Sequence, residues 1–212
     1  MLYVNDIFYS IQGESSFAGY PCKFVRLAGC NLKCGYCDTK EALDINNSSL
    51  LSIGEIISAL NSIGGGNNIR LIEITGGEPL LQEEAFDLFD ELIKLNYFVL
   101  LETNGTISLK KVHKKVVKII DVKCPSSCFS KEFNYENLKY IGASDEVKFV
   151  MGTEEDYNFA KDFLKINKIK TGKLIFSAVE GSMSSKELAE KILKDGLSVR
   201  LGIQLHKILR LK

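Results

Sequence analysis

Three cysteines in one short stretch carry the strongest chemical signal in the chain. Cys30, Cys34 and Cys37 follow a C-x3-C-x2-C spacing, so a single loop can direct all three sulfur atoms toward a common centre. Thiolates are soft ligands that favour zinc, copper(I) or iron–sulfur clusters. A structural zinc site closes its shell with four protein ligands, and a cubane cluster is commonly held by four cysteines. Three thiolates without a nearby fourth cysteine or histidine leave one metal position open, which indicates catalysis.

Other interpretations of the cysteines remain. A disulfide framework would need oxidising surroundings, and a non-enzymatic zinc-binding module is the alternative from another functional class. Cys124 and Cys128 form another C-x3-C pair that suggests a second cluster, but the pair lacks further partners. Cys22 is isolated. We interpret these last three cysteines as structural or incidental.

Composition narrows the class of protein. Lys plus Arg and Asp plus Glu both number 27 among 212 residues, so no net field favours nucleic acid or an anionic membrane. The first residues lack the basic and apolar segments of a signal peptide, and no apolar stretch approaches membrane-spanning length. We therefore expect a cytoplasmic protein, where thiols stay reduced.

Hydrophobic periodicity predicts alternating strands and helices. Expected strands cover residues 3–12, 23–27, 70–74, 97–102, 116–122, 146–151, 173–177 and 199–204, and expected helices cover 53–63, 82–95, 153–166 and 185–194. This alternation predicts a parallel sheet with helical crossovers. A full eight-stranded barrel typically needs more residues than this chain has. The fold class is therefore α/β with a partial (open) β/α barrel, in a single domain over residues 1–212 without linker or repeat.

Polar residues follow several of these strands. Gly76, Gly77 and Glu78 come directly after one, where paired glycines let a ligand approach the backbone, although a plain turn before a helix is the alternative. Glu102 ends the next strand, where it holds a ligand or belongs to an Asx-type turn. Lys123 and Ser177 lie at later strand ends. The lysine-rich residues 110–118, with His113, are interpreted as a solvated helix face.

The cysteine loop and the G-G-E-P sequence of residues 76–79 resemble the radical S-adenosylmethionine (SAM) enzymes. The resemblance implies a partial barrel of the radical SAM type and a [4Fe-4S] cluster held by Cys30, Cys34 and Cys37. It also implies that the methionine part of SAM occupies the fourth iron. By the same resemblance Gly76, Gly77 and Glu78 meet the amino end of SAM. Lys123 and Ser177 reach its carboxylate, ribose or adenine.

A narrower resemblance runs nearly from end to end. Residues 8–15 (FYSIQGES), 19–21, 24–30, 37–39, Thr75, 102–105 and 204–207 are similar to those of the 7-carboxy-7-deazaguanine synthases. That family makes the deazapurine core of queuosine-type tRNA bases. The resemblance implies conversion of 6-carboxy-5,6,7,8-tetrahydropterin to 7-carboxy-7-deazaguanine with loss of ammonia.

The same resemblance implies roles for individual residues. Arg26 grips the substrate carboxylate, for which a guanidinium fork is suited, and Thr39 is a Mg2+ ligand. Pterin contacts come from Gln12, Gly13, Glu14, Thr75, Glu102 and His206. Taken alone, Arg26 would be a surface salt bridge, His206 a satisfied edge-strand histidine and Thr39 an ordinary turn residue. No catalytic side chain is assigned, because the cofactor supplies the radical chemistry.

The implied cofactors are the [4Fe-4S] cluster, SAM and Mg2+. The implied partners are the small pterin substrate, an electron donor of the flavodoxin or ferredoxin type and a second copy of the chain in a homodimer, without nucleic acid or membrane. A radical SAM activase, which generates a glycyl radical on a partner protein, is the alternative enzyme. It would share Cys30, Cys34, Cys37 and residues 76–79 but would not need the pterin-binding set.

Overall fold

The computed structural model describes residues 1–211, in which nine strands form one mixed sheet in the order β3-β1-β2-β4-β5-β6-β7-β8-β9. Strand β1 pairs antiparallel with β2 and with β3. Every pairing from β2 to β9 is parallel. The strands are β1 (Leu2–Ile11), β2 (Pro21–Leu27), β3 (Ser49–Leu51), β4 (Leu71–Gly76), β5 (Phe98–Thr103), β6 (Val117–Asp121), β7 (Glu146–Met151), β8 (Leu174–Ala178) and β9 (Arg200–Gly202).

The sheet is curved but not closed, since β3 and β9 form its two edges. The prediction of an open β/α barrel is confirmed. All eight strands expected from the sequence are present, and β3 is a ninth in the part of the chain that the structure describes. Strand β3 gave no sequence signal, since three residues are too few to show an alternation.

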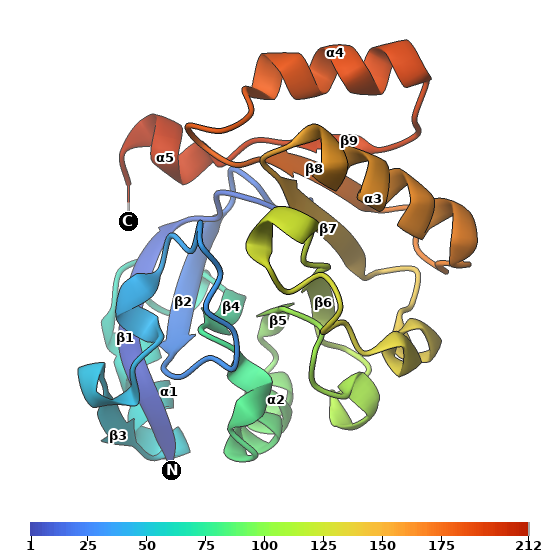
Figure 1. Cartoon of the computed structure of the whole chain (residues 1–212). Coiled ribbons are helices and arrows are strands. Elements are labelled where there is room, and N and C mark those ends of the chain that lie inside the picture. The colour runs from blue at the N-terminus through green and yellow to red at the C-terminus, as the bar shows by residue number, and fades with distance from the viewer. Residues whose placement is uncertain (212) are drawn as a thin grey trace.

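The α-helices are α1 (Ile53–Ser62), α2 (Glu84–Lys94), α3 (Glu154–Ile166), α4 (Ser185–Asp195) and the short α5 (Leu205–Leu209). Helices α1 to α4 lie around the outside of the curved sheet, while α5 lies beside the loop between β1 and β2 (Figure 1). Ser52 and Glu55 form a capping box at the start of α1, with Ser52 Oγ accepting from Glu55 N at 3.2 Å. Thr153 and Asp156 form a second capping box at α3.

The alternation of side chains along the strands decides what faces the interior of the barrel. Ile72 and Ile74 of β4 point outward into the main hydrophobic core with the helices, so Glu73 and Thr75 point inward. The same register turns Lys148 of β7 inward while its neighbours Val147 and Phe149 enter the core. Polar residues of buried strands therefore collect on the concave side of the sheet.

Two regions differ from expectation. The lysine-rich residues 110–118 do not form an α-helix: a short 3-10 turn (Leu109–Lys111) leads into β6, and Lys118 is buried against Asp145. The expected last strand over 199–204 ends at Gly202, and α5 follows it. Within residues 1–211, no helix has the length and apolarity needed to span a membrane.

Candidate active site

A cavity of about 500 Å³ opens at the carboxyl ends of the parallel strands, within the range of small-molecule sites. Most of the residues assigned to the site from the sequence line it. These are Gln12, Gly13, Glu14, Arg26, Cys30, Cys34, Cys37, Thr39, Thr75, Gly76, Gly77, Glu102, Lys123 and His206. Strand ends far apart in the sequence meet there because parallel strands present their carboxyl ends at one edge.

The cysteine loop leaves β2 and forms one wall of the cavity. Cys30, Cys34 and Cys37 are half-buried free thiols that all line it. Burial raises the pKa of the Cys30 and Cys34 thiols. Among residues 1–211, no three histidine, cysteine or acidic side chains gather closely enough to hold one metal ion. A cubane assigns each cysteine to its own iron, so these three lining thiols suit a cluster with one open iron.

The glycine pair after β4 is required by close backbone packing. A Cβ on Gly76 would lie 2.0 Å from Leu27 O, and one on Gly77 would lie 2.1 Å from Gly29 O. Gly76 also has a φ of +143°. The pair therefore lets the cysteine loop and β4 approach each other at the cavity wall.

Glu78 is fully buried and does not line the cavity. Its carboxylate accepts hydrogen bonds from Asn104 N at 2.7 Å, Thr103 Oγ1 at 2.9 Å and Leu80 N at 3.0 Å. Burial nevertheless raises the pKa of Glu78 to about 7. In this structure Glu78 ties the ends of β4 and β5 together beneath the site.

The end of β6 brings an ion pair to the cysteine loop. Lys123 Nζ donates to Asp121 Oδ2 at 2.8 Å, while Asp121 Oδ1 is buried without a hydrogen-bond partner among the described residues. Burial works against the charge of Lys123, but Asp121 raises the pKa of Lys123 overall. A buried acceptor and an ammonium group facing one cavity suit a zwitterionic ligand with hydroxyl and amino donors. Ser177 does not line the cavity; its Oγ faces Gly202, where a Cβ would lie 2.1 Å away.

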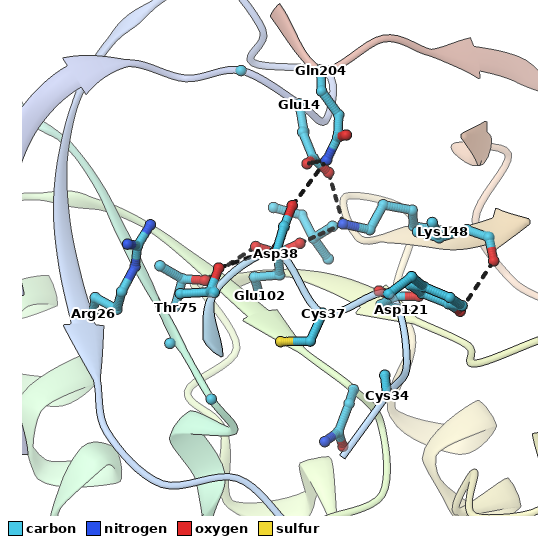
Figure 2. A pocket seen from close by; sticks show the side chains of 18 of the residues that line it. Glu14, Arg26, Cys34, Cys37, Asp38, Thr75, Glu102, Asp121, Lys148 and Gln204 are labelled. Carbon is cyan, nitrogen blue, oxygen red and sulfur yellow. Dashed lines mark hydrogen bonds and ion pairs between the residues drawn. The ribbon is translucent and has the colours of Figure 1, made fainter. Parts of the chain in front are cut away.

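The far end of the cavity holds a charged network (Figure 2). Lys148 Nζ donates to Glu14 Oε2 at 2.7 Å and also to Glu102 Oε1. Thr75 Oγ1 donates to the other oxygen of Glu102 at 3.1 Å. Arg26 lies on the opposite side of the cavity, with its guanidinium 3.3 Å from Glu41 and 5.1 Å from the centroid of the Phe8 ring.

Gln12 lines the cavity, but its side chain is already engaged. Its Oε1 accepts from Glu14 N at 2.6 Å and its Nε2 donates to the buried Glu73. Gln12 therefore orients the loop that carries Glu14. His206 lies against Gly13, where a Cβ would come within 2.0 Å of His206 Nδ1.

The loop after Cys37 supplies hard oxygen atoms. Thr39 Oγ1 donates to Asp38 Oδ1 at 3.1 Å, and Asp38 Oδ2 lies 3.0 Å from Lys207 Nζ. Burial opposes ionisation of Asp38, but its bond to Lys207 lowers its pKa to about 2. A hydroxyl beside an ionised carboxylate suits a hard cation such as Mg2+.

Sequence reasoning missed Lys148, Asp121 and Glu73 as residues of the site, and it noted Asp38 only as part of a motif. The available signal was a charged residue inside an apolar strand, as at Glu73 and Lys148. Gln204 was noted only as part of a motif, and it bridges Glu14 and Asp38 at 2.7 and 3.4 Å.

The chain is similar to known proteins over nearly its full length. Residues 25–122 match the model of the radical SAM superfamily. A 7-carboxy-7-deazaguanine synthase from Koribacter versatilis is 39% identical over 97% of this chain and 96% of its own length. One from Chlorobaculum tepidum is 42% identical over 97% and 93%. The chain belongs to the 7-carboxy-7-deazaguanine synthase family.

The fold agrees with this membership. The crystal structure of QueE from Escherichia coli matches with a TM-score of 0.78, covering 97% of this chain and 94% of that one at 21% identity. SuiB from Streptococcus suis, bound to its precursor peptide SuiA, matches with a TM-score of 0.55 over 81% of this chain and 46% of that one, at 15% identity. As a member of the 7-carboxy-7-deazaguanine synthase family, the chain is a radical SAM enzyme, and a [4Fe-4S] cluster and SAM follow from the superfamily.

Proposed function

We propose that this chain converts 6-carboxy-5,6,7,8-tetrahydropterin to 7-carboxy-7-deazaguanine with release of ammonia. One observation carries the proposal: the cysteine loop shares a single cavity with Arg26 on one side and the Glu14–Lys148–Glu102 network on the other. A carboxylated pterin has the matching polarity, since its carboxylate is an anion and its aminopyrimidine edge is rich in N–H donors.

The residues have distinct tasks in this reaction. Cys30, Cys34 and Cys37 would hold the cluster, which together with SAM would supply the radical chemistry. Asp121 and Lys123 offer an acceptor and a cation to SAM, while Gly76 and Gly77 shape the wall beside it. Glu78 supports this wall from beneath. Ser177 lies outside the cavity lining, so we give it no contact with SAM.

Arg26 binds the pterin carboxylate, for which its planar fork is suited. Its side chain is only 19% exposed, so this charge lies largely within the protein. Glu14 and Glu102 accept hydrogen bonds from the opposite edge of the ring, and Thr75 and His206 add polar contacts. Water exclusion and fixed geometry then dominate catalysis, rather than an acid–base pair.

Mg2+, the electron donor and the assembly are part of the same proposal. Thr39, with Asp38 beside it, would hold Mg2+ against the substrate carboxylate. We further propose an electron donor of the flavodoxin or ferredoxin type, a homodimer and a cytoplasmic setting in tRNA modification. The chain would act as one domain, of which Lys212 lies outside the described residues.

The test is turnover by the anaerobically reconstituted protein. We expect incubation with SAM, reductant, Mg2+ and the carboxylated tetrahydropterin to give a product with the mass of 7-carboxy-7-deazaguanine. Cys34→Ser should abolish turnover, because Cys34 lines the cavity and is one of the three thiols proposed to hold the cluster. Cys128→Ser is the matched control and should keep it, because Cys128 is exposed and lies outside the lining.

Two outcomes would contradict the proposal. Zinc without iron or sulfide after reconstitution would indicate the zinc-binding module. An intact cluster that cleaves SAM but leaves the pterin unchanged would favour the activase.

A further inference from the structure

Lys148 is a buried cation between two carboxylates that come from different parts of the chain. It lies on β7, and its side chain is only 5% exposed. Its Nζ bonds to Glu14, in the loop after β1, and to Glu102, at the end of β5. Figure 2 shows the junction formed by Glu14, Lys148 and Glu102 across the cavity from Arg26. These residues therefore link the loop after β1 to strands β5 and β7 at the cavity wall.

Further hydrogen bonds fix the remaining atoms of the junction. Gln204 Nε2 donates to the second oxygen of Glu14 at 2.7 Å, and Thr75 donates to the second oxygen of Glu102. Each carboxylate oxygen thus has one protein donor and keeps acceptor capacity. The two carboxylates are therefore oriented before any ligand binds, which reduces the entropy lost on binding.

The junction holds more acidic groups than basic ones. Glu14, Glu73 and Glu102 face one ammonium group, so full ionisation would leave a net charge of −2. Burial and the charges of Glu102 and Glu14 raise the pKa of Glu73 well above its ordinary value, which favours its neutral form. Burial also opposes ionisation of Glu14, but Lys148 holds its pKa below its ordinary value. With Glu73 in its neutral form, Glu14, Glu102 and Lys148 together carry a net charge of −1.

We infer that Lys148 is a positioning residue for pterin recognition. It holds the carboxylates of Glu14 and Glu102 side by side, so that both accept from the N–H groups of the aminopyrimidine edge while Arg26 takes the carboxylate at the other end. Without Lys148 the two carboxylates repel each other and separate or take up a proton. This inference rests on the proposed function and deepens it, because it assigns the orientation of the substrate to one buried cation.

A second buried lysine provides a matched control. Lys118 of β6 is 8% exposed and pairs with Asp145, which is 1% exposed, at 2.8 Å. Neither residue lines the cavity. Lys118→Met and Lys148→Met therefore each break a buried ion pair, but only Lys148→Met disturbs the cavity.

The first measurement is the steady-state and binding behaviour of the reconstituted variants. We expect Lys148→Met to raise the KM and Kd for the carboxylated tetrahydropterin by about tenfold or more, with the Kd for SAM unchanged. Lys148→Arg should restore part of the affinity, since it returns the charge. Lys118→Met should lower the unfolding midpoint while leaving the pterin Kd at the wild-type value.

The second measurement is the pH dependence of kcat/KM. The groups that face Lys148 are Glu14, Glu73 of β4, Glu102 of β5 and Asp121 of β6, and Asp38 of the cysteine loop also faces Glu14. Removing the ammonium group raises the pKa of Glu14, since Lys148 lowers it in the wild type. The acidic limb of the profile should therefore move to higher pH in Lys148→Met and stay in place in Lys118→Met.

A double variant separates positioning from general stability. In an E102Q background one of the repelling charges is already absent, so Lys148→Met should cost less pterin affinity than it costs in the wild type. Equal costs in both backgrounds, or an unmoved pH limb together with a wild-type pterin Kd in Lys148→Met, would overturn the inference.

Binding by calorimetry keeps this test distinct from that of the proposed function. A wild type that binds the pterin without converting it would overturn the proposed function, and the affinity of Lys148→Met would still decide the inference. A wild type that does not bind the pterin would overturn both.

Discussion

The Glu78 carboxylate is fully buried and accepts hydrogen bonds from Leu80 N, Thr103 Oγ1 and Asn104 N. These hydrogen bonds favour the ionised form of Glu78, but burial disfavours it more strongly and raises the pKa of Glu78 to about 7. A carboxyl whose pKa is higher in the folded than in the unfolded protein binds an extra proton in the folded state between these two values. Its contribution to stability is therefore present at low pH and is lost as the pH rises toward about 7.

Glu78→Gln removes this titration. We expect the wild type to lose about 2 to 3 kcal/mol relative to Glu78→Gln between about pH 4.5 and 8. Urea unfolding of the cluster-free proteins across this range measures the difference. Parallel curves for the two proteins would show that folding does not raise the pKa of Glu78.

At the scale of elements, the two capping boxes differ in how they connect to the rest of the protein. The box at α1 is local and exposed, since the side chains of Ser52 and Glu55 bond to each other and to each other's backbone N–H. The box at α3 includes Asp156, which is fully buried and also accepts from Ser126 N at 2.8 Å and Ser126 Oγ at 2.6 Å. Asp156 thereby ties the start of α3 to the loop that follows β6 and Lys123.

Asp156→Ala should therefore destabilise the protein more than Ser52→Ala. We expect a loss of about 1 kcal/mol for Ser52→Ala, as for an exposed N-cap. For Asp156→Ala we expect about 3 kcal/mol or more, because several buried donors lose a charged acceptor. Urea unfolding at pH 7 gives both values. Equal losses would mean that the contact with Ser126 adds nothing.

The short helix α5 shows what one element adds to the site. Figure 1 shows α5 beside the loop that joins β1 and β2, and Leu205 N donates to Gly13 O at 2.8 Å. From this position Gln204, His206 and Lys207 reach Glu14, Gly13 and Asp38. Gln204, His206 and Lys207 thus form part of the cavity wall together with the loop after β1.

At the scale of the whole molecule, the core and the metal centre occupy different places. The main hydrophobic core combines the outward faces of the strands with helices α1 to α4, and Cys30, Cys34 and Cys37 are not part of it. Burial of this core stabilises the fold by the hydrophobic effect. In small zinc modules, by contrast, metal binding supplies the folding free energy.

Removal of the cluster should therefore leave the protein folded. We expect the cluster-free protein, kept reduced, to retain the far-UV circular dichroism of the loaded enzyme and a cooperative thermal transition. The transition temperature should rise on reconstitution and again with SAM, because ligands that bind only the folded state stabilise it. Loss of the cooperative transition on removing iron would contradict this division between core and site.

The sequence by itself determined the cysteine loop, helices α1 to α4 and, among the described residues, every strand except β3. These features depend on local spacing and on alternation within a few residues. It also placed Gly76, Gly77 and Glu102 at strand ends, where parallel strands must bring them together.

Only the tertiary structure decided which buried charges meet. Lys148 contacts partners 134 and 46 residues away along the chain, at Glu14 and Glu102, and no local pattern encodes a pairing across strands that are not sequence neighbours. The tertiary structure also directed Glu78 beneath the cavity and Ser177 away from it. The physical reason is that side-chain spacing specifies the face of a strand, while sheet order and curvature decide what that face meets.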